Sequence, residues 1–227
     1  NLYANLSWKE KLGSQWKLFL GSSYSNNLDE ISNQLQDENN DPVFSTEMPY
    51  RSKNFNGDIR AELTQVKGVL DRRLWGLSVV RFGGEWLYFR DKLNFTDSIS
   101  RSTTINDHFK AGFLETDIYI TNNIAAKLGA RVEHSSLMQR SNLVPRVSLA
   151  YKLAPKSQVS LAYGIFYQKP ERNQLVIDKK LDYTKATHYI ANYQKITALN
   201  VFRVEAFYKK YDDLVKTVPL LSNHGKG

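Results

Sequence analysis

The chain of 227 residues contains no cysteine, which excludes disulfide frameworks, thiolate metal sites and cysteine nucleophiles. Long apolar runs are also missing, and the mean hydropathy is −0.48. No segment approaches the roughly 18 consecutive apolar residues that a membrane-spanning helix requires. A transmembrane β-barrel remains compatible with these absences, because only alternate residues of its strands face lipid and its sequence is therefore polar on average.

Blocks of charge of one sign are absent as well. The net charge is +8, but the 31 Lys and Arg residues are interspersed with 23 Asp and Glu residues along the whole chain. A nucleic-acid groove requires a basic stripe or patch, so we expect no nucleic-acid partner. Aromatic residues are abundant, with 13 Tyr, 11 Phe and 4 Trp. Amphipathic rings in this number are typical of the two interfaces of a membrane.

Apolar and polar residues alternate along segments of about ten residues, the length that a tilted strand needs to cross a bilayer. The alternation is clearest in Ile124–Glu133, Val144–Leu153 and Gln158–Gln168. Common soluble strands are about half as long. Further strands are predicted at Leu2–Trp8, Gln15–Tyr24, Lys53–Val66, Arg73–Phe89, Asp107–Ile120, Lys185–Lys195 and Asn200–Tyr211.

The connections between these segments alternate in length, as in barrels with short periplasmic turns and long outer loops. The predicted short turns are Lys9–Ser14, Lys67–Arg72, Thr121–Asn123, Ala154–Ser157 and Ile196–Leu199. The predicted outer connections are Asn26–Ser52, Arg90–Asn106, the shorter Leu137–Asn142, and Lys169–Thr184. Together these features predict an all-β fold, an antiparallel transmembrane β-barrel of about ten strands.

No motif indicates an enzyme, a metal site or a cofactor. The four histidines are far apart, and none shares a strand face with a second ligand at metal spacing. Glu115 and Asp117 alternate onto one face, as the carboxylates of a hydrolase do. Lysine and arginine residues on the corresponding faces of nearby strands favour charge pairing across a barrel wall instead. Gly83 and Gly84 are interpreted as a β-bulge.

Charged residues on the faces opposite the apolar band are expected to line the interior of the barrel, since a charge on lipid is costly. These lumen-lining candidates are Arg60, Glu62, Glu115, Asp117, Lys127, Arg131, Glu133, Arg146, Lys152, Arg203 and Glu205. Lipid is expected to contact the opposite band, which includes Val147, Leu149, Val159 and Leu161.

The sequences of four later segments resemble the barrel of TonB-dependent outer-membrane receptors of the Bacteroidota type. These segments are Leu143–Tyr151, Ala162–Pro170, Ala186–Ile190 and Arg203–Tyr211, and the resemblance is best over residues 108–214. It implies a protein of the bacterial outer membrane with a 22-stranded barrel that an N-terminal plug domain closes. It also implies import of a scarce nutrient, energised through a periplasmic TonB-type partner.

The sequence departs from that family by omission, since no plug, partner-binding box or closing strand is evident. We therefore expect about ten strands of a larger barrel, although ten strands can also close alone. The alternative function is a barrel without transport that acts as a structural or interaction subunit, beside a surface lipoprotein or other outer-membrane subunits. Arg131 and Arg146 are hypothesised to hold a plug, and structural pairing with Glu133 or Glu115 is the alternative.

Overall fold

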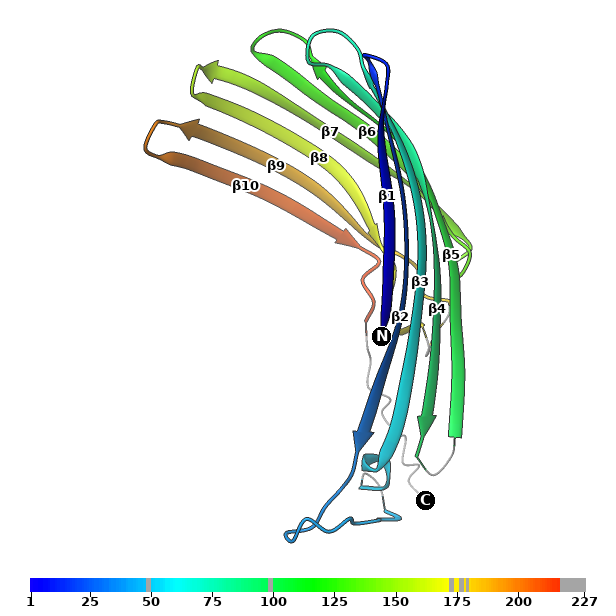
Figure 1. The fold of residues 1–227 in the computed structure, drawn as a ribbon. Coiled ribbons are helices and arrows are strands. Elements are labelled where there is room, and N and C mark those ends of the chain that lie inside the picture. Colours follow the sequence, from blue (N-terminus) through cyan, green and yellow to red (C-terminus); the bar gives the residue numbers. More distant parts are fainter. Residues whose placement is uncertain (48–49, 98–99, 172–173, 176–177, 179, 217–227) are drawn as a thin grey trace.

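The computed structural model describes residues 1–47, 50–97, 100–171, 174–175, 178 and 180–216. These residues form one curved antiparallel sheet of ten strands in chain order (Figure 1). The all-β fold and the ten predicted strands are therefore confirmed. The strands are β1 (Leu2–Leu12), β2 (Trp16–Asn33), β3 (Phe55–Arg73), β4 (Val79–Thr96), β5 (Ser100–Tyr119), β6 (Ile124–Ser135), β7 (Arg140–Ala154), β8 (Ser157–Gln168), β9 (Thr184–Ile196) and β10 (Val201–Asp212).

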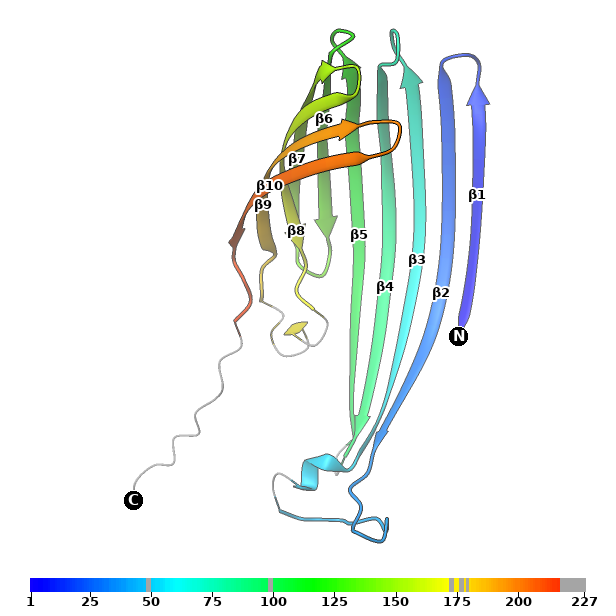
Figure 2. The same ribbon diagram turned by 90° about the vertical axis from the view of Figure 1, so that its left-hand side faces the viewer.

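The turns β1–β2, β3–β4, β5–β6, β7–β8 and β9–β10 lie at one end of the sheet, and the connections β2–β3, β4–β5, β6–β7 and β8–β9 lie at the other, as Figure 2 shows. A single 3-10 turn, Tyr50–Lys53, precedes β3 within the described connection from β2. None of the helical segments in the described ranges has the length and apolarity needed to cross a membrane. Only the connections 34–54 and 169–183 are longer than the turns at the opposite end, so the predicted alternation of connection length holds for two of the four outer connections.

The predicted extents of two outer connections are wrong, because one is largely strand and the other begins later than predicted. β4 continues to Thr96 and β5 begins at Ser100, which leaves only residues 97–99 between them in place of the loop Arg90–Asn106. β2 likewise continues to Asn33. Outside a bilayer both faces of a hairpin meet water, so the backbone pairing continues while the alternation of polarity that marks a strand disappears.

The predicted turn Lys67–Arg72 is also wrong, because these residues lie inside β3. The chain reverses at residues 74–78, where Gly76 has a φ of +55°. The Ser78 amide donates to the Trp75 carbonyl at 2.9 Å. The fully buried Ser78 hydroxyl accepts the Tyr119 amide at 3.1 Å. Backbone hydrogen bonds and the left-handed Gly76 therefore close this turn, and the Ser78 side chain ties it to β5.

Gly83 and Gly84 form no bulge, since the register between β3 and β4 is uninterrupted from Asn56 to Arg73. A Cβ on Gly83 would lie 2.4 Å from the Gly68 carbonyl oxygen and 2.8 Å from the Phe113 ring. Gly83 is therefore required because the neighbouring backbone and ring occupy the space of a side chain.

Directly paired residues share a face of a sheet, so the register assigns every strand's two faces. One face, the belt face, presents exposed apolar side chains from all ten strands. Exposed apolar area of this extent is typical of a surface that contacts lipid. Its members include Leu6, Leu20, Phe82, Leu114, Leu128, Leu149, Leu161, Tyr189 and Val204. The opposite face is called the lumen face.

Aromatic side chains mark where the belt face ends towards the longer connections. Trp86 and Tyr88 stack at 6.4 Å on β4, and His108 of β5 stacks on Tyr88 at 4.7 Å. On β5 the belt face changes from apolar at Leu114 to charged at Lys110, which pairs directly with Trp86. Residues from Lys110 to the end of β5 therefore cross the bilayer, about the ten residues that a tilted strand requires.

Candidate functional site

The register places nine of the eleven predicted lumen-lining residues on the lumen face. These nine are Glu115, Asp117, Lys127, Arg131, Glu133, Arg146, Lys152, Arg203 and Glu205. They lie opposite the apolar belt on β5, β6, β7 and β10. The lumen face is thus charged along most of its width, as the interior of an aqueous or plugged barrel is.

The face predicted for Arg60 and Glu62 is wrong. Both pair with residues of the belt side, Arg60 with Lys92 and Glu62 with Arg90. Phe55, on the other parity of β3, therefore lies on the lumen side. This part of β3 extends beyond the aromatic boundary, where an apolar side chain does not indicate lipid and a charged one does not indicate the lumen.

Glu85 and Arg131 form the centre of a charge network on the lumen face. The Arg131 guanidinium donates to the Glu85 carboxylate and, through Nε at 3.1 Å, to Glu133. The Lys67 ammonium lies 3.8 Å from Glu85. Glu133 is buried, and Arg131 is about one fifth exposed. Arg131 therefore makes the structural pairing with Glu133 that was the alternative to holding a plug, and it also pairs with Glu85.

Three other ion pairs lie on the same face. Arg81 binds Asp71 through two nitrogens, at 2.7 and 3.1 Å, which is the geometry that best matches a guanidinium fork to a carboxylate. The remaining two pairs are single contacts, Lys127 with Asp117 at 3.3 Å and Arg203 with Glu205 at 2.7 Å.

Arg146 and Glu115 differ from these residues, because within the described ranges neither is in an ion pair. The Arg146 guanidinium lies 5.0 Å from the centre of the Phe166 ring. Glu115 packs its Cγ near Gly129. Both side chains line a hollow of about 460 Å³ on the lumen face. Its other lining residues include Phe19, Lys67, Arg81, Phe113 and Arg131.

Phenylalanine rings on the lumen face cover glycines, and a cation lies over each ring. Such a ring shields the backbone beside a residue that has no side chain. A cation above an aromatic face is favourable by electrostatics. The arrangement repeats in Gly21 with Phe19 and Lys9, in Gly83 with Phe113 and Lys67, and in Gly164 with Phe166 and Arg146.

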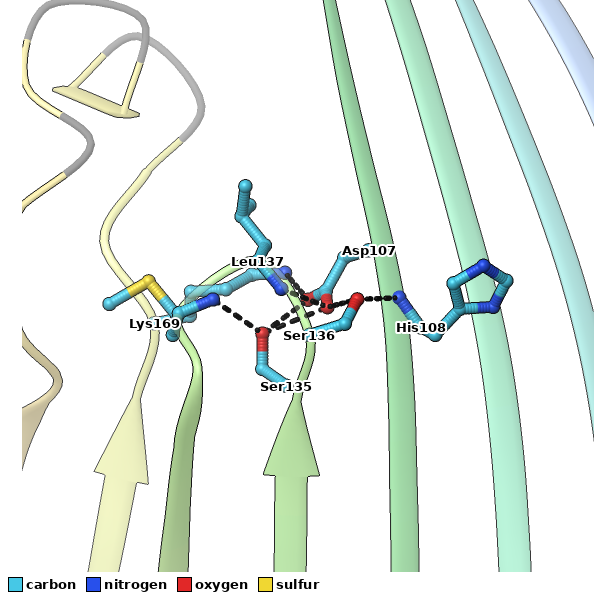
Figure 3. Close-up of polar contacts among 7 residues, drawn as sticks. Asp107, His108, Ser135, Ser136, Leu137 and Lys169 are labelled. Carbon is cyan, nitrogen blue, oxygen red and sulfur yellow. Dashed lines mark hydrogen bonds and ion pairs between the residues drawn. The ribbon is translucent and has the colours of Figure 1, made fainter.

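A second polar cluster centres on Asp107, in the part of β5 just beyond the aromatic boundary (Figure 3). Its carboxylate is 1% exposed. The Ser135 hydroxyl lies 2.8 Å from both carboxylate oxygens, and the Leu137 amide donates at 3.1 Å. The Ser136 hydroxyl lies 3.3 Å away, and the Lys169 ammonium donates at 2.8 Å. Hydrogen bonding of this density is what a buried carboxylate requires.

The Asp107 cluster joins three parts of the wall. β5 rises past the tight turn between β6 and β7, and Lys169 begins the connection from β8 to β9. Lys169 also lies over the Phe89 ring of β4 at 4.9 Å. At the far end of this connection, Asp182 pairs with Arg140 at 3.2 Å. Both ends of residues 169–183 are therefore tied to neighbouring wall elements, and the first end lies on the lumen face.

Burial acts to raise the pKa of Asp107, but the hydrogen bonds from Lys169, Leu137 and Ser135 outweigh it. The pKa of this carboxyl, which lies outside the membrane-crossing part of β5, is consequently below that of a free aspartate. Asp107 is thus charged at neutral pH, and its ion pair with Lys169 is intact there.

Sequence reasoning missed Asp107, Lys169, Lys67 and Glu85. The sequence pattern places Asp107 at the start of a strand and Lys169 in a loop, so it predicts no shared face for them. It places Lys67 in a turn. A signal was present in Ser135 and Ser136, whose adjacent hydroxyls precede a tight reversal and are typical partners of a carboxylate.

No group of three or more metal-ligating side chains lies together in the part of the chain that the structure describes. An antiparallel sheet with an apolar belt outside and paired charges inside is the wall of an outer-membrane barrel. The chain belongs to the TonB dependent receptor-like β-barrel family, whose model matches residues 1–225. Proteins of this family are outer-membrane receptors of Gram-negative bacteria and are not enzymes.

Solved structures of similar fold include two receptors and an outer membrane transporter. A variant of the ferric enterobactin receptor PfeA from Pseudomonas aeruginosa gives a TM-score of 0.75 at 13% identity over 92% of this chain. The siderophore receptor PirA from Acinetobacter baumannii gives 0.74 at 14% identity over 93%. The outer membrane transporter YddB from Escherichia coli gives 0.68 at 11% identity over 91%. The chain spans 34% of each of these proteins. No curated protein matches the sequence.

Proposed function

We propose that this chain is part of the barrel of a transporter that imports a scarce nutrient across the outer membrane. A plug domain and further strands would complete the protein, and a periplasmic TonB-type partner would supply the energy. The observation that carries the proposal is the hollow lined by Arg146 and Glu115, which have no ion-pair partner in the described wall. Charges held at a lumen without a wall partner are available to a plug or to a passing ligand.

The charges around the hollow also suit reversible contacts. Lys67, Arg81 and Arg131 are already neutralised by wall carboxylates, so the wall keeps its shape without a bound partner. Arg146 presents a guanidinium fork that binds carboxylate or phosphate at two points. A transported ligand or a moving plug needs contacts that form and break, and an unpaired arginine on a rigid wall supplies one.

Uptake by a deletion strain that produces the full-length protein tests this function. Radiolabelled ferric enterobactin is the first probe, because structurally similar proteins include receptors for siderophores. Cobalamin and an oligosaccharide mixture follow as probes of other nutrient classes. The proposal expects uptake of one class that requires both this gene and the TonB-type partner. The alternative, a subunit beside a surface lipoprotein, predicts co-purification of that lipoprotein with unchanged uptake of every probe.

A further inference from the structure

A hollow of about 560 Å³ lies at the outermost ends of β2, β3 and β4, and it is called the tip hollow. Side chains from these strand ends and from the connection 34–54 line it, among them Asn33, Gln34, Phe44, Phe55, Asn56 and Thr96. Figure 2 shows this connection beyond the ends of the strands. Ligand pockets are typically of roughly 300 to 1,000 Å³, so the tip hollow has the size of a binding site.

The tip hollow lies well outside the bilayer. Thr96 is eight residues beyond Tyr88 on β4, which is about 26 Å along the strand at about 3.3 Å per residue. The headgroup layer is only roughly 5 to 7 Å thick, and a strand tilted by about 45° still rises well beyond it. A ligand therefore reaches the tip hollow from the medium, and a lipid headgroup does not reach it.

The part of the connection beside the hollow is fixed by its own hydrogen bonds. Residues 35–43 form a short hairpin in which the Val43 amide donates to the Leu35 carbonyl at 2.9 Å. The Asn54 side chain holds both arms, because it accepts the Leu35 amide at 2.5 Å and donates to the Val43 carbonyl at 2.7 Å. Phe44 follows this hairpin directly and is 80% exposed. A ligand that covers this ring pays little for ordering the backbone.

A second ring in the lining, Phe55, belongs to the strand part of the hollow. It stacks on Phe95 with 4.7 Å between the ring centres. The Phe95 ring in turn lies beside Gly57, where a Cβ would meet it at 3.1 Å. Phe55 is thus held by the wall and Phe44 by the connection, so the tip hollow has an aromatic ring from each.

The polar groups of the lining are mainly amides with unused hydrogen-bonding capacity. Asn56 Oδ1 accepts the Ser32 hydroxyl at 2.9 Å, and Asn33 Nδ2 donates to the Lys53 carbonyl at 2.6 Å. Each bond occupies one end of an amide, which leaves Asn56 Nδ2 and Asn33 Oδ1 without a partner in the described ranges. The Gln34 side chain has no hydrogen-bond partner among the described residues. Donors and acceptors are therefore both offered to a ligand.

This lining selects a neutral, hydroxyl-rich ligand. Asp97 is the one charged residue among the described residues that line the hollow, and its carboxylate repels an anion. A hydroxyl group both donates and accepts hydrogen bonds, as the amides here do. The C–H groups of a sugar ring carry the partial positive charge that packs favourably on the negative face of an aromatic ring.

We propose that the tip hollow binds a neutral oligosaccharide from the medium. One sugar ring packs on Phe44, and its hydroxyls bond to the amides of Gln34, Asn33 and Asn56. The inference rests on the proposed function in one respect, that the captured oligosaccharide is the imported nutrient. Oligosaccharide binding without uptake would refute import alone. Uptake of another nutrient by a protein that binds no oligosaccharide would refute this inference alone.

The test uses the purified full-length protein in a detergent without a sugar headgroup. Arrays of neutral, sulfated and uronic-acid oligosaccharides are probed beside an array of peptides, and calorimetry measures the dissociation constant of the strongest neutral binder. Phe44→Ala is expected to weaken its binding at least about tenfold, because the burial of an aromatic side chain is lost. Gln34→Met keeps the length of the side chain but removes the amide, and it is expected to weaken binding about fivefold.

The matched control is Tyr50→Ala, which removes an exposed aromatic ring of the same connection that does not line the hollow. Its dissociation constant should equal that of the wild type. Gel mobility with and without heating confirms that each barrel is folded. The proposal is overturned if no neutral oligosaccharide binds at millimolar concentration, or if only acidic oligosaccharides or peptides bind. It is equally overturned if Phe44→Ala binds as the wild type does, or if Tyr50→Ala shows the same loss.

Discussion

The ammonium of Lys169 lies 2.8 Å from the carboxylate of Asp107, 62 positions earlier in the chain, and that carboxylate is 1% exposed. The contact crosses from the start of the β8–β9 connection to β5, above the turn between β6 and β7. It therefore determines where the β8–β9 connection begins relative to the lumen face.

Replacing Lys169 with Met should release the start of this connection, because the change leaves a buried carboxylate without its cation. Breaking a buried ion pair in this way costs about 3 to 5 kcal/mol. Arg140→Met is the matched control at the other end of the connection, since its pair with Asp182 is about half exposed and contributes little. Limited proteolysis of residues 169–183 measures the effect. Equal cleavage of both variants would show that the buried pair has no special role.

The same pair makes the connection sensitive to strong acid. The pKa of Asp107 is lowered in the folded protein, so its contribution is fully present above the pKa of an unfolded aspartate and is lost as pH falls through the folded value. The absence of native cysteine allows a spin label at Lys180→Cys to report the mobility of the connection. Mobility should rise only below the usual aspartate range. An Asp107→Asn protein should be mobile at every pH, and a pH response retained in that protein would contradict the assignment.

Paired residues on β7 and β8 test the assignment of faces. Leu149 and Leu161 are direct partners on the belt face, and Ser148 lies next to Leu149 on the lumen face. An arginine at Leu149 or Leu161 should destabilise the barrel by roughly 2 to 4 kcal/mol, because it places a charge in lipid. Ser148→Arg should be tolerated. Denaturant unfolding in lipid vesicles measures both changes, and equal costs would mean that the faces are reversed or mixed.

Gly83 and Gly84 provide a test of close packing within the wall. Gly83→Ala should destabilise by about 1 to 3 kcal/mol, since its Cβ would overlap the Gly68 carbonyl and the Phe113 ring. In Gly84→Ala the new Cβ would lie 3.4 Å from the nearest backbone oxygen, so this variant should unfold at nearly the wild-type denaturant concentration. A similar loss in both variants would attribute the effect to glycine flexibility instead of to this contact.

Alternation of polarity was sufficient to predict the ten strands and the faces of those parts that cross the bilayer. It failed for Arg60 and Glu62, and for the extent of β4 and β5, because both faces of these segments meet water and the sequence loses its period there. The network of Glu85 with Arg131 depends on the register between β4, β5 and β6. Register is set by the lengths of turns, and the misplaced turn at Lys67 made that pairing unpredictable.

The buried Asp107 cluster was unpredictable for a different reason. Its partners come from β5, from the β6–β7 turn and from the β8–β9 connection. Their meeting depends on how far each hairpin rises beyond the bilayer. Sequence patterns give the crossing segments because lipid imposes an alternation on them, but no such rule governs the heights of hairpins in water.

Uptake in cells that produce the full-length protein with Arg146→Gln tests the central claim most directly. Uptake is measured with the nutrient identified in the probe series and is divided by the amount of barrel in the outer membrane. Arg203→Gln is the control, because Arg203 is paired with Glu205 in an exposed part of the wall. If Arg146 binds the plug or the ligand during import, uptake per barrel should be at least tenfold lower for Arg146→Gln. The control should show normal uptake. Unchanged uptake per barrel in Arg146→Gln would contradict the account and would leave Arg146 as a wall residue.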